Sequence, residues 1–196
     1  MKNLFLVLTI LMYSSLSAQV SHSNDFDDWR VIRFENGQIY AYTKGSPIEN
    51  SSLKPDLTFI IKNDEGGTFY FRLDNADLYK YDKEGKKNFV DIDVIVDDND
   101  ILNFGGKLKN HKLKDGEEQV WVNFSILEDG VSFSELIKQI KNGKYVYVRA
   151  TGAGNPLVFK FSAKGFIKAH EKSVEFYKLN RENNPFAKSK DNPFNG

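Results

Sequence analysis

The chain has 196 residues, and its 27 basic and 27 acidic side chains cancel at neutral pH. This balance argues against nucleic acid as a partner, because nucleic-acid-binding proteins concentrate basic charge on one face. The chain contains no cysteine, which excludes disulfide bonds and leaves packing alone to hold the fold together.

Residues 1–18 have the layout of a cleavable secretory signal peptide. Lys2 supplies the positive charge, residues 4–12 (LFLVLTILM) form an apolar run, and small residues follow up to Ala18. The run is too short to span a bilayer, which takes about 20 apolar residues. A buried first element of a cytosolic protein would not explain this order of charge, apolar run and small residues. We therefore expect export to the periplasm or the medium, with no transmembrane segment in the mature chain.

Alternation of apolar and polar residues, the period of a β-strand, dominates the middle of the sequence. Eight or nine strands are predicted, at 29–34, 38–44, 57–62, 68–73, 89–96, 101–108, 119–126, 144–150 and 157–162. The dipeptide Asn36-Gly37 predicts a tight hairpin turn between the first two of them. Gly105-Gly106 predicts a β-bulge.

Two short helices interrupt or follow the strands. Ser132 and Glu135 have the spacing of a capping box before an apolar helix that ends near Gly143. Apolar residues recur every three or four positions over residues 166–179 and predict the second helix. The expected fold is mainly β, an antiparallel β-sandwich or open barrel with two short helices, forming a single domain over residues 19–179.

Residues 180–196 are polar and interrupted by proline, and we predict a disordered tail. Within this tail one tripeptide occurs twice, as Asn184, Pro185 and Phe186 and again as Asn192, Pro193 and Phe194. Two copies on a flexible tether suggest a bivalent docking element for a partner, because a second linked contact raises avidity. Chance repetition in a disordered end is the favoured interpretation.

The sequence carries no signature of an enzyme or of a bound cofactor. It lacks cysteine and any G-x-S-x-G nucleophile motif. The three histidines, His22, His111 and His170, have no second ligand at the spacing of a zinc site. We expect all three to be solvated.

An acidic cluster is the one group of residues that suggests a metal. It comprises Asp91, Asp93, Asp97, Asp98 and Asp100. Calcium prefers six to eight oxygen ligands, but the glycine and distal glutamate of an EF-hand loop are missing. A solvated strand face followed by a turn is the favoured interpretation, with calcium as the alternative.

Tyrosines are frequent: five cluster in the first half of the chain, and two lie on a late predicted strand. They are Tyr40, Tyr42, Tyr70, Tyr79, Tyr81, Tyr145 and Tyr147. Exposed rings of this kind bind sugars or peptides. Strands also prefer aromatic residues for packing alone, and that interpretation is favoured.

Four short stretches together carry a family resemblance. They are FSELI at 133–137, KYVYVR at 144–149, GNP at 154–156 and FKFSAKGF at 159–166. With them, residues 57 to about 172 resemble the secreted β-domains of the invasion-associated locus B and VasI-type (type VI secretion accessory) kind. The cysteines common in locus B proteins are absent here, and the tail is extra. The resemblance implies a periplasmic or surface β-domain of a Gram-negative bacterium that acts through contacts.

These observations lead to a non-enzymatic exported protein that binds a partner protein or a cell-envelope component. The alternative is a secreted carbohydrate-binding or glycan-processing protein that uses exposed aromatic rings with paired acids.

Overall fold

The structure of the chain, a computed structural model, describes residues 19–48, 55–62, 66–74, 89–112, 118–127, 130–152 and 156–182. The predicted signal peptide and both Asn-Pro-Phe motifs lie outside these residues. Neither helix of the described part has the length and apolar character needed to cross a membrane.

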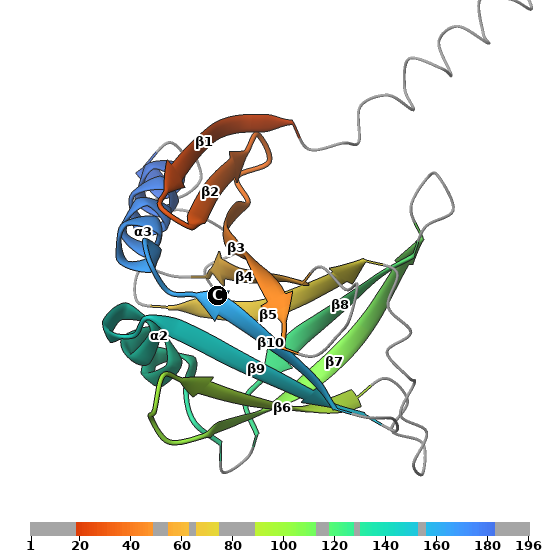
Figure 1. Cartoon of the computed structure of the whole chain (residues 1–196). Helices are drawn as coiled ribbons and strands as arrows, with labels where there is room; N and C mark the ends of the chain where they lie inside the picture. Colours follow the sequence, from red (N-terminus) through yellow and green to blue (C-terminus); the bar gives the residue numbers. More distant parts are fainter. Residues whose placement is uncertain are drawn as a thin grey trace, which may run out of the picture.

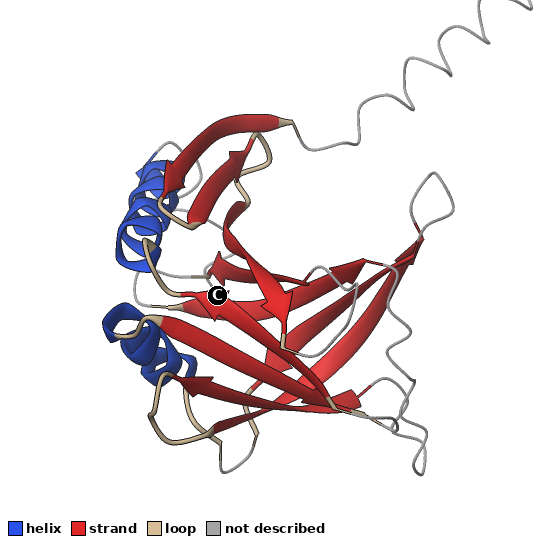
Figure 2. Cartoon of the chain, viewed as in Figure 1, coloured by secondary structure: helices blue, strands red, loops and turns tan. Residues whose placement is uncertain are grey.

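The described part contains ten strands and two helices (Figures 1 and 2). The strands are β1 (Val20–Phe26), β2 (Trp29–Phe34), β3 (Ile39–Pro47), β4 (Pro55–Ile61), β5 (Gly67–Asp74), β6 (Phe89–Val96), β7 (Leu102–Lys112), β8 (Glu118–Ser125), β9 (Tyr145–Thr151) and β10 (Leu157–Ser162). The helices are α2 (Phe133–Asn142) and α3 (Phe166–Glu182).

Eight of these strands close into an antiparallel barrel. They follow one another in the order β3-β10-β9-β6-β7-β8-β5-β4, and the pairing of β3 with β4 completes the ring. The hairpin of β1 and β2 extends the sheet outward from β3, and Figure 1 shows it beyond the barrel wall. The expected mainly β fold with two helices is confirmed, and the barrel is the arrangement that the chain adopts.

Strict alternation explains why the predicted strands form. On β6, Val90, Ile92 and Val94 are fully or almost fully buried in the barrel, while the intervening Asp91 is exposed. On β10, Phe159 and Phe161 are 1% and 0% exposed, as residues two apart on one strand face should be.

Two glycine predictions have opposite outcomes. Gly37 has a φ of 82° in the turn between β2 and β3, which confirms the predicted tight hairpin. The predicted bulge at Gly105-Gly106 is wrong, because Gly105 pairs with Asp91 and Gly106 with Val90 in regular register. Glycine is needed at 106 for space instead: a Cβ there would lie 2.7 Å from a methyl carbon of Val90.

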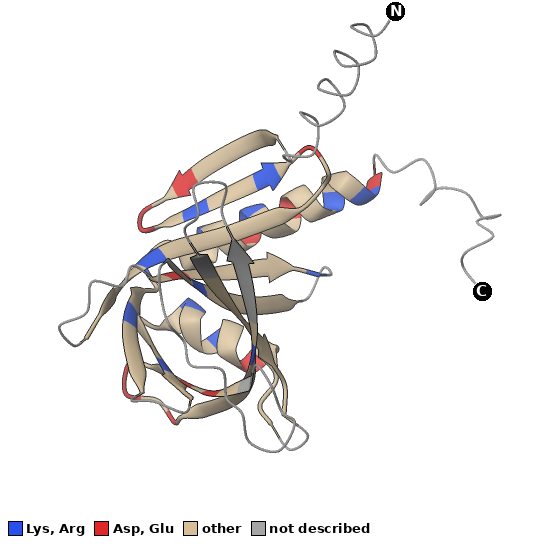
Figure 3. Cartoon of the chain, turned by 90° about the vertical axis from the view of Figure 1, so that its right-hand side faces the viewer, with Lys and Arg blue, Asp and Glu red and all other residues tan. Residues whose placement is uncertain are grey.

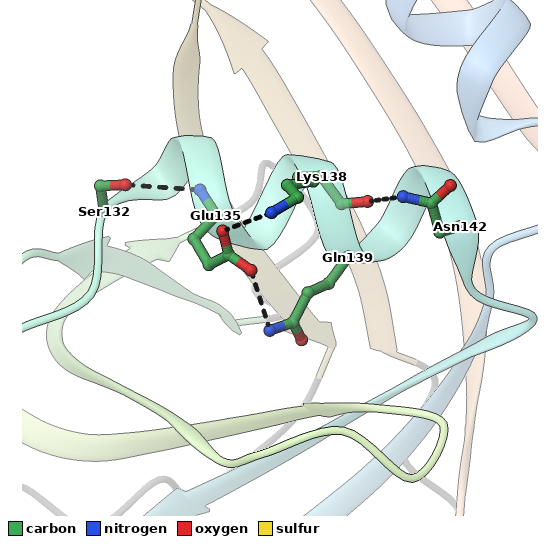
Figure 4. Close-up of polar contacts among 5 residues, drawn as sticks. All are labelled: Ser132, Glu135, Lys138, Gln139 and Asn142. Atoms are coloured by element: carbon green, nitrogen blue, oxygen red, sulfur yellow. Dashed lines mark hydrogen bonds and ion pairs between the residues drawn. The ribbon is translucent and has the colours of Figure 1, made fainter.

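Helix α2 begins at the predicted cap. The Ser132 hydroxyl accepts a hydrogen bond from the Glu135 backbone N–H at 3.3 Å. The Glu135 carboxylate reaches along the helix to Lys138 at 3.5 Å and Gln139 at 3.4 Å (Figure 4). These contacts stabilise the first turn, and buried Ile140 on the opposite side packs into the core.

Helix α3 connects the barrel to the hairpin. The ring centroid of Phe166, at its first residue, lies 4.8 Å from that of Trp29 on β2 and 6.1 Å from that of Phe59 on β4. The helix ends at Glu182, three residues beyond the predicted end at Leu179. Asn180 accounts for this extra length, because its Nδ2 donates a 2.7 Å hydrogen bond to the carbonyl oxygen of Gly37.

Candidate functional site

Strand β3 has two different neighbours along one edge. Its residues 39–43 pair with β2, and its residues 45–47 pair with β10. β4 pairs with residues 40–44 of β3 and closes the barrel there. The two neighbours therefore separate near Lys44, where the hairpin leaves the barrel.

A cleft of about 540 Å³ opens at this separation, and we call it the hairpin cleft. It is lined by Asp25, Asp27, Asp28, Trp29, Arg30, Tyr42, Thr43, Lys44 and Ser162. Its volume falls within the range of about 300–1,000 Å³ that is typical of ligand pockets. The lining comes from the turn of the first hairpin, from β3 and from the end of β10.

The acids of the hairpin cleft are held by neighbouring groups. Arg30 donates to both carboxylate oxygens of Asp25, at 2.5 and 3.1 Å. The Lys164 ammonium lies 3.2 Å from the Asp27 carboxylate. Figure 3 shows acidic residues at the β1–β2 turn beside basic residues on β2. Both ion pairs are solvent-exposed, so they orient these acids only weakly in the free protein.

The paired charges also determine the protonation of the cleft wall. The hydrogen bond from Arg30 lowers the pKa of Asp25 below its ordinary value. The same bond, with a further contribution from the Tyr42 phenol, raises the pKa of Arg30. Both side chains therefore stay charged at neutral pH.

Two polar groups of the hairpin cleft have no partner among the described residues. The Thr43 side chain is 1% exposed, and its hydroxyl oxygen forms no hydrogen bond in the described part of the chain. Lys44 is exposed, and no ion pair is formed by its ammonium within those same residues. A buried hydroxyl without a partner costs about 1–3 kcal/mol. Thr43 is too deeply buried for a ligand to reach, so Lys44 is the group that the cleft leaves for one.

The third acid of the cleft, Asp28, joins the hairpin to the barrel. Its carboxylate accepts a 2.6 Å hydrogen bond from the Ser162 hydroxyl on β10. Its backbone N–H donates to the carbonyl oxygen of Lys164 at 3.3 Å. The sequence does not predict this site, since its residues come from strands brought together only by the topology. Only the polarity of these residues is visible in the sequence.

An aromatic row crosses the outer face of the barrel. Tyr40 and Tyr70 have centroids 6.3 Å apart, and Tyr70 stacks on Trp121 at 4.9 Å. Tyr70 is only 4% exposed, and burial raises its pKa to about 12. The predicted cluster therefore forms in part, but Tyr70 lies within the packing and offers no open ring face.

The remaining predicted tyrosines lie elsewhere. Tyr145 and Tyr147 are on β9, where the Lys160 ammonium lies 3.6 Å from the Tyr145 ring centroid. Tyr79 and Tyr81 lie outside the described residues.

The acidic cluster is divided among structural contacts. Asp93 accepts hydrogen bonds from Arg149 at 2.7 Å and from Asn103 at 2.6 Å. Asp97, whose φ is 51°, accepts the backbone N–H groups of Lys144 and Tyr145 at 2.8 and 2.9 Å. Within the described residues no group of three or more His, Cys, Asp or Glu side chains is placed to hold a metal ion.

The three histidines have different environments. His22 lies on β1 with its ring 5.7 Å from that of Phe176, and His111 lies on β7. The prediction that all three are solvated is wrong for His170, which is 7% exposed. Its ring lies 5.4 Å from Phe59 and 5.9 Å from Phe166, because α3 packs on the barrel end. Burial lowers the pKa of His170 to about 4.

Comparisons with known proteins inform the fold. A scan against protein-family models gives no match, and a search of curated proteins gives none either. Among solved structures, the crystal structure of invasion associated protein B from Bartonella henselae is similar, with a TM-score of 0.51 and 13% sequence identity. The similarity covers 81% of this chain and 99% of that one. At the level of the fold, this confirms the resemblance to locus B proteins: the chain is built on the same overall fold as invasion associated protein B.

Proposed function

We propose that this chain is a non-enzymatic exported protein that binds a partner protein or cell-envelope component in the hairpin cleft. The observation that carries the proposal is the cleft itself, where the exposed Lys44 ammonium is left for a ligand beside the Asp25–Arg30 and Asp27–Lys164 ion pairs. Export to the periplasm or the medium follows from the signal-peptide layout of residues 1–18.

The acidic side chains of the cleft are better suited to binding than to acid–base catalysis. A general acid or base works best with a pKa near the operating pH. Asp25 is shifted the other way, since the hydrogen bond from Arg30 lowers its pKa. Asp28 is engaged by the Ser162 hydroxyl. These groups are suited to recognising charge and hydrogen-bond donors rather than to moving protons.

An affinity capture from envelope extracts tests this function. The full chain is compared with Tyr42→Ala and Lys44→Glu, which alter the cleft, and with Tyr147→Ala as the matched control. Tyr147 is also a half-buried strand tyrosine, but it lies on β9. We expect one species to bind the wild type and the control and to be lost from both cleft variants. Equal capture by all four proteins would refute the role of the cleft.

The aromatic row keeps the carbohydrate alternative open to a direct test. Tyr40 and Trp121 are half-buried, and such rings form sugar-binding surfaces. Against it, the stacking of Tyr70 on Trp121, with an interplanar angle of 6°, covers one face of each ring. A glycan array and a hydrolase screen distinguish the two functions. Tight glycan binding that is lost in Tyr40→Ala, or glycan hydrolysis that is lost in Asp28→Asn, would favour the carbohydrate function over the one proposed above.

A further inference from the structure

Strand β1 is an open edge of the sheet. It pairs with β2 on one side, and no described residue pairs with its other side. From Val20 to Asp25 its residues are exposed, and only Phe26 is half-buried. An exposed edge of this kind presents unpaired backbone N–H and C=O groups to any second strand.

The hairpin turn determines which backbone groups are free. Phe26 and Trp29 flank a two-residue turn and so form a hydrogen-bonded pair. Alternation along the ladder makes Asn24 and Val31 the next such pair. The N–H and C=O groups of the residues on either side of Asn24, at positions 23 and 25, therefore point away from β2.

A bulge limits the length of this edge. The register with β2 shifts between Val20 and His22. Bulges of this kind protect an edge strand from unwanted pairing. The regular, available part of the edge is thus residues 22–26.

This short edge is complementary to itself. We infer that two copies of this chain associate through antiparallel pairing of β1 with β1, around a twofold axis at Asn24. In that register Ser23 lies opposite Asp25 of the second copy, and each contributes outward backbone groups. The geometry allows four backbone hydrogen bonds between the copies.

The side chains fit the same register. His22 of one copy lies opposite Phe26 of the other, which adds an aromatic pair beside Phe176. No two like charges face each other, and Asp25 is already neutralised by Arg30 on its own β2. The two α3 helices lie on the same face of the joined sheet, and the two hairpin clefts lie at its opposite ends.

Association is tested by light scattering and sedimentation of the full chain over a range of concentrations. We expect the measured mass to rise with concentration from that of the monomer toward twice that value, because a five-residue pairing gives a weak dimer. Ser23→Pro removes an outward N–H while leaving the bonds to β2, and should weaken association at least tenfold. Ser23→Ala keeps that N–H and should dimerise like the wild type.

Single cysteines test the register, since the chain has no cysteine of its own. On oxidation Asn24→Cys should give a disulfide-linked dimer, because residues opposite each other at a non-hydrogen-bonded position have Cα atoms about 4.5 Å apart. Ser23→Cys should not, because the two cysteines would lie diagonally, about 7–8 Å apart. A monomer at every concentration, a dimer unaffected by Ser23→Pro, or cross-linking through position 23 rather than 24 would each overturn the inference.

Discussion

The indole Nε1 of Trp29 donates a 2.9 Å hydrogen bond to the carbonyl oxygen of Ser162, a residue 133 positions later in the chain. This bond joins β2 to the end of β10 across the separation that forms the hairpin cleft. The indole is 1% exposed and also packs on Phe166 of α3. One side chain thus holds the hairpin, the barrel and the closing helix together.

Replacing Trp29 with phenylalanine should destabilise the protein by about 1–3 kcal/mol, because the Ser162 carbonyl loses its donor and the core loses volume. The free energy of unfolding, from denaturant titration followed by circular dichroism, measures the effect. Trp121→Phe, on the outer face, is the matched control and should cost less. An equal loss in both variants would contradict the role assigned to Trp29.

The free energy of unfolding should decrease as the pH falls, because His170 is buried in its neutral form. Burial lowers its folded pKa to about 4, against 6.5 for the free side chain. Between these values the unfolded state binds more protons, so lowering the pH favours unfolding. The contribution is complete above about pH 6.5 and is lost as the pH falls toward 4, at a cost of about 2–3 kcal/mol.

The variant His170→Leu isolates this effect from the titration of the carboxylates. Its unfolding free energy, measured from pH 7 to pH 4, should decline less steeply than that of the wild type. Parallel pH profiles for the two proteins would show that His170 does not titrate with the expected pKa.

Truncating the buried phenylalanines of β10 should lower the free energy of unfolding by a large amount. Phe159→Ala and Phe161→Ala should each cost about 3–5 kcal/mol, because both rings are almost fully buried. Lys160→Ala, between them on the outer face, should cost less than about 1 kcal/mol. Denaturant titration of the three variants checks this alternation, which a small loss at either phenylalanine would contradict.

Much of the barrel is visible in the sequence because its strands bury one face. Phe159 and Phe161 alternate with polar residues, and Ser132 caps α2 where the spacing predicts it. Strand β1 was missed because its sequence, VSHSNDF, has no apolar face. It is held by pairing with β2 and by contacts with α3 rather than by burial of its own side chains.

The candidate site was not predictable in the same way. Asp28 and Ser162 meet across 134 positions, and only the closure of the barrel brings them together. The burial of His170 also depends on a tertiary contact, the packing of α3 against Phe59. Periodicity predicted that helix but not what its polar residues would face.

The tail prediction requires a truncation point that leaves α3 intact. A chain ending at Glu182 keeps the hydrogen bond between Asn180 and Gly37, whereas one ending at Leu179 loses it. If the two Asn-Pro-Phe motifs dock a partner, capture from envelope extracts should fall in this truncation. It should fall equally in a full-length chain carrying Phe186→Ala with Phe194→Ala. Unchanged capture by both proteins would mean that the motifs have no docking role.

Hydrogen–deuterium exchange tests the cleft most directly. Exchange is measured for the free protein and for its complex. The ligand in the complex is the envelope species that the wild type captures and the cleft variants do not. Binding in the hairpin cleft should slow exchange at residues 25–30 and 42–44, which contain the residues that line it. Protection confined to β9, or to residues beyond Glu182, would contradict it.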